Sequence, residues 1–308
     1  MKRTLTVLLA FLLVSGVAFA AADTMGMNGN LAIKYKSAQS NDATAGNFQL
    51  DAAQNFLTVN VNDFTAYYRI STNALYKYYV DYKVTELSGL DLRVGMQDIP
   101  LAKYYTHTYS LTESCLAYDK DGLGIVATYV MNELAVKAGI FNNAIGLGGV
   151  SATAGTLNQT PAYALEVTYD LTDAMNMDML EIGAGYAQDT PNNGAWAVFG
   201  QVTTMGITAD LEYLAQANAG AGSTSDSYLT VGGAYQVTSA LAVGASYQML
   251  KIQSTEPKII TIGADYALTS KMALRLEGVL PTYDSWNSYS NDRYYQIAVN
   301  CIDRKSVV

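Results

Sequence analysis

The sequence predicts an all-β fold, a transmembrane antiparallel up-and-down β-barrel of about 16 strands, with 14 and 18 as alternatives. Apolar and polar residues alternate with a period of two from residue 31 to residue 301. Tyrosine and glycine are abundant, at 24 and 25 residues, while only 15% of the chain is charged, against about 25% in soluble domains. After the first twenty residues, no apolar run is long enough to span a bilayer as a helix.

Residues 1–20 have the three parts of a secretory leader. Two basic residues come first, an apolar run follows over 5–17, and Ala18-Phe19-Ala20 matches the small-x-small pattern that signal peptidase cuts. The run is shorter than the roughly 20 apolar residues that a spanning helix needs. We therefore expect a cleaved signal peptide over residues 1–20 and one outer-membrane β-barrel domain over residues 21–308.

The chain is acidic and poor in the residues that most catalytic and metal sites use. Its formal net charge is −9, so nucleic acid is not expected as a partner. Two cysteines are too few for a disulfide scaffold, and the single histidine, His107, leaves little material for histidine-based hydrolysis or metal binding. We expect no catalytic residues, no metal and no cofactor.

Alternating segments follow one another along the whole chain. About seventeen candidates are present, and bacterial single-chain barrels have an even number of strands, so we expect 16. The clearest lie at 31–36, 76–84, 90–96, 134–140, 163–169, 182–186, 211–213, 227–237, 240–251, 257–267, 271–279 and 293–301, and the weakest at 48–53 and 114–119.

Short connections alternate with longer polar segments. Thr238-Ser239 and Thr269-Ser270 are short turns. Outer-membrane barrels place short turns in the periplasm and long loops outside the cell. A secreted β-sandwich would alternate as well, but its solvent face carries many charges, whereas here that face is rich in Gly, Ala, Ser, Thr and Tyr. The segments expected at the cell exterior are 37–54, 142–161, 217–227 and 280–292.

Several short motifs follow one another along the predicted strands. Their letters are YVDYK at 79–83, LDLRVG at 90–95 with Pro100 after it, AGIFN at 138–142 and LEY at 211–213. Over about residues 50–280 the chain resembles the phosphate-selective porin O and P family. The resemblance implies a 16-stranded barrel in the cell outer membrane, usually a homotrimer, with one loop folded inward to narrow the pore.

The alternation also predicts which charged side chains point into the barrel. Consecutive strands lie side by side, so each half of the sequence forms one half of the wall. The first half gives a basic wall with Asp81 and Asp91 as acidic exceptions, and the second gives an acidic wall with Arg275 as its one base. The basic wall is Lys34, Lys36, Arg69, Lys77, Lys83, Arg93 and Lys137, and the acidic wall is Glu166, Glu181, Asp210, Glu212, Asp265 and Glu277.

The inward loop is expected at 98–113 or 142–161, because each segment follows a strand that matches the family and is too long for a tight turn. Lys103 and His107 are the charged candidates in the first.

The prediction is a passive pore for small hydrophilic solutes or ions, surrounded by outer-membrane lipid and without enzymatic activity. Its charge-segregated lumen would create a transverse field, and the acidic excess predicts weak cation preference rather than anion selectivity. Two alternatives stay open. One is a structural or adhesive barrel without an open pore, and the other is an outer-membrane hydrolase that uses His107.

Overall fold

The computed structural model contains sixteen strands and one short helix within the residues that it describes. The described residues are 24–36, 48–71, 74–103, 121–142, 161–190, 193–218, 227–251, 256, 258–269, 272–282 and 294–301. The elements are β1 (Thr24–Lys36), β2 (Phe48–Val61), β3 (Phe64–Ser71), β4 (Ala74–Lys83), β5 (Leu90–Asp98), β6 (Asp121–Met131), β7 (Leu134–Phe141), β8 (Ala162–Asp170), α2 (Thr172–Met175), β9 (Met179–Thr190), β10 (Asn193–Thr204), β11 (Ile207–Asn218), β12 (Ser227–Gln236), β13 (Leu241–Lys251), β14 (Lys258–Ala267), β15 (Met272–Thr282) and β16 (Tyr294–Cys301).

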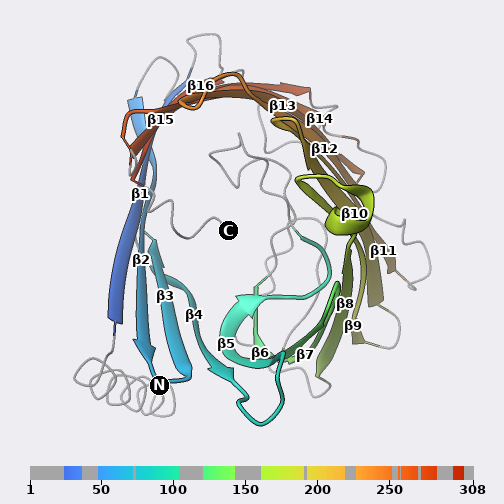
Figure 1. Ribbon diagram of the computed structural model, residues 1–308. Helices are drawn as coiled ribbons and strands as arrows, with labels where there is room; N and C mark the ends of the chain where they lie inside the picture. The colour runs from blue at the N-terminus through green and yellow to red at the C-terminus, as the bar shows by residue number, and fades with distance from the viewer. Residues whose placement is uncertain are drawn as a thin grey trace.

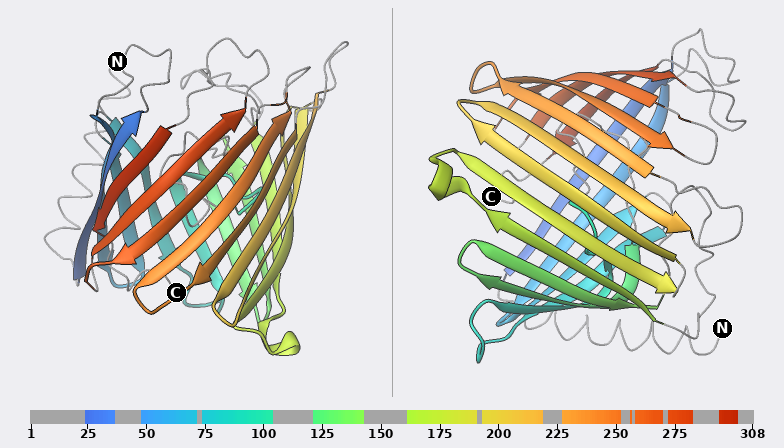
Figure 2. Two further views of the ribbon diagram at one scale, coloured as in Figure 1. Left: turned by 90° about the horizontal axis from the view of Figure 1, so that it is seen from above. Right: turned by 90° about the vertical axis from the view of Figure 1, so that its right-hand side faces the viewer.

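The strands close into one antiparallel barrel in which each strand is hydrogen-bonded to its neighbours in sequence. The ring is completed by β1 and β16, whose register runs from Gly29 opposite Cys301 to Lys36 opposite Tyr294. Figure 1 looks along the barrel, and Figure 2 shows that the strands are inclined to its axis. Closure leaves no unpaired sheet edge. The predicted 16-stranded up-and-down barrel is therefore confirmed.

The connections at the two ends of the barrel differ in length. At one end, two-residue turns join β2 to β3, β6 to β7 and β10 to β11, and in them Asn62, Asn132 and Met205 have φ values of 49°, 52° and 51°. Asparagine is the commonest non-glycine residue in this left-handed region. The connections that contain the four long polar segments all leave from the opposite end. The four long segments therefore share one end, which also carries the two-residue connections between β3 and β4 and between β9 and β10.

One segment differs from its prediction, and two predictions fall outside the described residues. Residues 48–53, a weak strand candidate placed largely within a loop, form the start of β2, which pairs with β1 down to Phe48 opposite Tyr35. Its alternation of apolar Phe48, Leu50 and Ala52 with polar Gln49 and Asp51 is short, and a register shift between Ala32 and Ile33 of β1 interrupts the pairing there. The expected signal peptide at 1–20 and the strand candidate at 114–119 are not among the described residues.

The outer face of the barrel is apolar. Ile125, Ile140 and Ile182 are 54%, 54% and 47% exposed, while every second side chain on the same strands turns inward. Aromatic pairs lie outside near both rims, with Phe64 stacked on Tyr82 at 4.7 Å and Trp196 against Tyr213 at 5.3 Å between ring centroids. Such aromatic bands suit the two interfaces of a bilayer.

The helix α2 occupies the connection between β8 and β9. Among the described residues, no helix has the length and apolar character needed to cross a membrane.

Candidate functional site

The chain turns into the barrel immediately after β5. The amide of Leu101 donates a hydrogen bond of 2.8 Å to the Ile99 carbonyl, which makes a three-residue turn centred on Pro100. Proline suits that position because its ring fixes φ near the value that such a turn needs. Figure 1 shows β5 curving into the lumen. We call residues 99–103 the inward segment.

The inward segment packs against the inner face of β9. Leu101 is 0% exposed and joins a buried apolar cluster with Ala164, Ala187 and Ala197 of the neighbouring strands. A Cβ atom on Gly185 would collide with the backbone carbonyl of Leu101. The small residues of β8, β9 and β10 therefore leave the room in which this segment lies.

An ion pair fixes the end of the inward segment to the same strand. The Lys103 Nζ atom lies 2.9 Å from both carboxylate oxygens of Glu181, and both side chains are about one-quarter exposed. Glu181 belongs to β9, four strands away from β5 around the ring. The segment therefore crosses part of the lumen. His107 lies outside the described residues.

A second charged cluster holds the base of this segment. The buried Lys77 of β4 forms an ion pair with Asp98, and its Nζ atom is 3.1 Å from Asp121 Oδ1. Asp98 and Asp121 stand opposite each other where β5 ends and β6 begins. Lys77 therefore neutralises two carboxylates that would otherwise repel each other.

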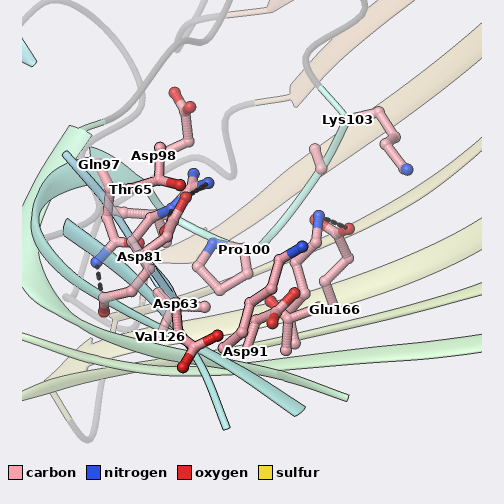
Figure 3. A pocket seen from close by; sticks show the side chains of 16 residues that line it. Asp63, Thr65, Asp81, Asp91, Gln97, Asp98, Pro100, Lys103, Val126 and Glu166 are labelled. Atoms are coloured by element: carbon pink, nitrogen blue, oxygen red, sulfur yellow. Dashed lines mark hydrogen bonds and ion pairs between the residues drawn. The ribbon is translucent and has the colours of Figure 1, made fainter. Parts of the chain in front are cut away.

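A cavity of about 430 Å³ lies inside the barrel, with the inward segment as one of its sides. Figure 3 shows acidic side chains gathered around it, with Pro100 among them. Its basic residues come from β4, β5, β7 and the inward segment, and its apolar residues are few. The lining is Asp63, Thr65, Asp81, Lys83, Asp91, Arg93, Gln97, Asp98, Ile99, Pro100, Ala102, Lys103, Val126, Thr128, Lys137 and Glu166.

Two ion pairs in the cavity wall each join two adjacent strands, β4 to β5 and β7 to β8. Arg93 donates from Nε and Nη2 to the two oxygens of Asp81 at 2.6 Å and 2.9 Å, and its guanidinium lies 3.9 Å from the centre of the Tyr79 ring. Lys137 Nζ lies 2.7 Å from Glu166 Oε1. Bidentate arginine pairs of this kind are geometrically well defined.

The opposite wall, β11 to β15, carries acidic and hydroxyl side chains. Asp210, Glu212 and Glu277 point inward and are buried. Arg275 donates to both oxygens of Asp265, at 2.5 Å from Nε and 2.6 Å from Nη2. Buried polar residues of the same wall are Thr230, Ser246, Gln248 and Thr261.

Many of the predicted wall residues whose side chains the structure describes are paired with opposite charges. Lys77, Arg93 and Lys137 of the basic wall each contact a carboxylate, and Glu166, Glu181 and Asp265 of the acidic wall each contact a base. Arg69 and Lys83 lie on the same face of β3 and β4. Lys34 stands opposite Gln296 in the register of β1 and β16, and the side chains of Lys34 and Lys36 lie outside the described part of the structure, so their place in the basic wall stays a prediction.

Sequence reasoning missed the residues that position the inward segment. Leu101, Gly185, Asp98 and Asp121 were not singled out, because their roles depend on which strands meet across the barrel. The sequence feature that could have predicted the turn after β5 is Pro100, which comes directly after that strand. Among the described residues, no group of three or more His, Cys, Asp or Glu side chains is arranged to hold a metal ion.

Comparisons with known proteins give one family and a set of similar folds. The model of the family described as Gram-negative porin matches residues 72–280. No curated protein matches the chain. The narrower resemblance to the phosphate-selective O and P family is not singled out by these matches and stays a prediction.

Solved structures of outer-membrane proteins share the fold at low sequence identity. The channel DcaP of Acinetobacter baumannii is similar with a TM-score of 0.64 and 13% identity, covering 91% of this chain and 97% of that chain. A variant of the Rh. blastica porin gives 0.60 and 14%, covering 90% and 99%. OmpT of Vibrio cholerae gives 0.58 and 12%, covering 90% and 96%.

Proposed function

From its membership of the Gram-negative porin family, to which the chain belongs, we propose that this outer-membrane protein is a passive diffusion pore for small hydrophilic solutes and ions. The observation that carries the proposal is the pairing of an apolar outer face with a charged cavity of about 430 Å³ inside a closed barrel. Apolar side chains on the outer face contact the hydrocarbon of the lipid bilayer, while charged side chains on the inner face favour water and polar solutes.

The inward segment is the constriction that we propose. It is anchored on β9 by Leu101 and Lys103, so it narrows the passage from a fixed position. The alternative constriction, 142–161, falls almost wholly outside the described residues. We propose further that the end of the barrel that carries the four long connections faces the cell exterior, as in other outer-membrane barrels.

We propose weak cation preference, carried by the acidic excess of the lumen rather than by two opposed walls. The ion pairs on both sides reduce the separation of charge that the sequence predicts, because each joins a base to a nearby acid. Asp210, Glu212 and Glu277, all acidic, line the wall formed by β11 to β15. Selectivity for phosphate, the finer implication of the family resemblance, would need a basic constriction, and Lys103 is paired.

Single-channel recording in planar bilayers tests the proposal. We expect discrete conductance steps and, under a salt gradient, a reversal potential of the sign that indicates cation preference. Absence of conductance from correctly folded protein would contradict the pore. It would favour the structural or adhesive barrel instead.

Two finer proposals need separate measurements. A homotrimer is the assembly that the family resemblance implies, and native mass spectrometry in detergent tests it. The hydrolase alternative rests on His107, and protease and lipase assays of wild type and His107→Ala test it, because equal and negligible rates in both would remove it.

A further inference from the structure

Three charged residues at one side of the cavity lack the neutralising contacts that the other cavity charges have. Within the described part of the chain, Lys83, Asp63 and Asp91 form no ion pair, whereas Arg93 contacts Asp81. All three side chains are exposed and line the cavity. They are therefore available to a solute.

These three residues lie next to one another. Lys83 stands directly opposite Asp91 in the register of β4 and β5. The amide of Lys83 donates a hydrogen bond of 3.0 Å to the carbonyl of Asp63, which brings the turn between β2 and β3 to the end of β4. The result is an acid, a base and an acid side by side, and directly opposite residues on paired strands have Cβ atoms about 5 Å apart.

The cavity as a whole has strong local fields and little net charge. Four bases, namely Lys83, Arg93, Lys103 and Lys137, line it together with five carboxylates. A solute with a single charge meets attraction and repulsion at short distances there, whereas a solute with both charges can place each beside its opposite.

The same cavity offers a small apolar surface. Pro100, Ala102 and Val126 line it beside the charged groups, and the first two belong to the fixed inward segment. The volume is in the range of about 300–1,000 Å³ that small-molecule sites occupy. A compact solute with a short apolar side chain therefore has both charged and apolar partners within one cavity.

We infer that the cavity is a weak binding site for zwitterionic solutes of the α-amino acid type with small side chains. The carboxylate pairs with Lys83, the ammonium group pairs with Asp91 or Asp63, and the side chain lies toward Pro100 and Ala102. This inference rests on the proposed pore function, because such a site would be filled and emptied by permeating solute.

Uptake by proteoliposomes of four labelled solutes of similar size tests the inference. L-Alanine carries both charges, L-alaninamide the positive one, L-lactate the negative one and L-lactamide neither. At low millimolar concentration we expect L-alanine to enter faster than the other three. The variant Lys83→Gln with Asp91→Asn keeps the net charge and should lower the ratio of alanine to lactamide uptake by about two- to fivefold.

The control changes a base and an acid outside the cavity. Glu133→Gln with Lys251→Gln alters two exposed residues, one in the turn between β6 and β7 and one at the end of β13, and should leave the ratio unchanged. Equal uptake of alanine and lactamide in wild type, or a ratio unaffected by Lys83→Gln with Asp91→Asn, would overturn the zwitterion site while leaving the pore intact. Alaninamide uptake as fast as that of alanine would also overturn it. If no solute enters faster than into empty liposomes, the pore itself is refuted and the site with it.

Discussion

Replacing Gly185 by alanine should release the inward segment without disturbing the barrel. A Cβ atom at this position would collide with the backbone of Leu101, which cannot yield as a flexible side chain can. Strand β9 itself tolerates alanine, because its ladder is formed by backbone groups and glycine is no better than alanine in a strand. The perturbation therefore acts on the segment alone.

The size of the effect follows from the contacts that would be lost. Full burial of a leucine side chain contributes about 1.5–3 kcal/mol, and Leu101 is 0% exposed. The Lys103–Glu181 pair, about one-quarter exposed on both sides, adds at most about 1 kcal/mol after screening by solvent. Since each 1.4 kcal/mol is tenfold, a loss of about 2–4 kcal/mol lowers the ratio of docked to displaced segment by about one to three orders of magnitude.

Planar-bilayer recording measures the outcome. We expect higher mean single-channel conductance and more open-channel noise for Gly185→Ala, with unchanged heat-dependent gel mobility as the sign of a folded barrel. Gly233→Ala on β12 is the matched control, because its Cβ would meet only the Thr208 carbonyl oxygen, at an ordinary 3.6 Å. Wild-type conductance and noise from folded Gly185→Ala would refute the placement of the segment on β9.

Three further predictions concern the anchors and the orientation. Lys103→Glu should raise open-channel noise, and adding Glu181→Lys should restore it toward wild type, whereas additive effects would exclude a direct pair. Lys77→Ala removes the base that pairs with Asp98 and lies 3.1 Å from Asp121 Oδ1, so the free energy of unfolding measured with urea in lipid vesicles should fall by about 3–5 kcal/mol; a loss below about 0.5 kcal/mol would mean that solvent screens the two carboxylates. In a cysteine-free background, an impermeant thiol reagent on intact cells should label Asn142→Cys and not Met205→Cys, and the reverse pattern would invert the proposed orientation.

The alternation of side chains was sufficient to predict the barrel and most of its strands. The expected segments 240–251, 257–267 and 293–301 correspond to β13, β14 and β16 within one residue at each end. One face of each strand contacts lipid and the other faces the water-filled lumen. Apolar and polar residues therefore alternate with a period of two along every strand. The start of β2 was predicted only as a weak strand candidate at 48–53, because its alternation is short and overlaps a polar segment expected to be a loop.

The charged contacts of the lumen could not be predicted from position in the chain. Lys137 and Glu166 were assigned to opposite walls, yet they stand directly opposite each other in the register of β7 and β8, where the two halves of the sequence meet. The pair of Lys103 with Glu181 depends on the path of the inward segment across the lumen. Strand periodicity fixes which way a side chain points, but not what it meets there.

The seam between β1 and β16 sets a condition on how the barrel is assembled. Every other pairing joins strands that follow each other in the chain, so each can form as a local hairpin with a small loss of chain entropy. The seam alone joins the two ends of the barrel sequence, and until it forms β1 presents an open row of backbone donors and acceptors. Formation of this last ladder should therefore be the slow step of barrel assembly. A chain truncated before Tyr294 lacks β16, so it would expose unpaired backbone edges on β1 and β15 and should aggregate rather than insert into the membrane.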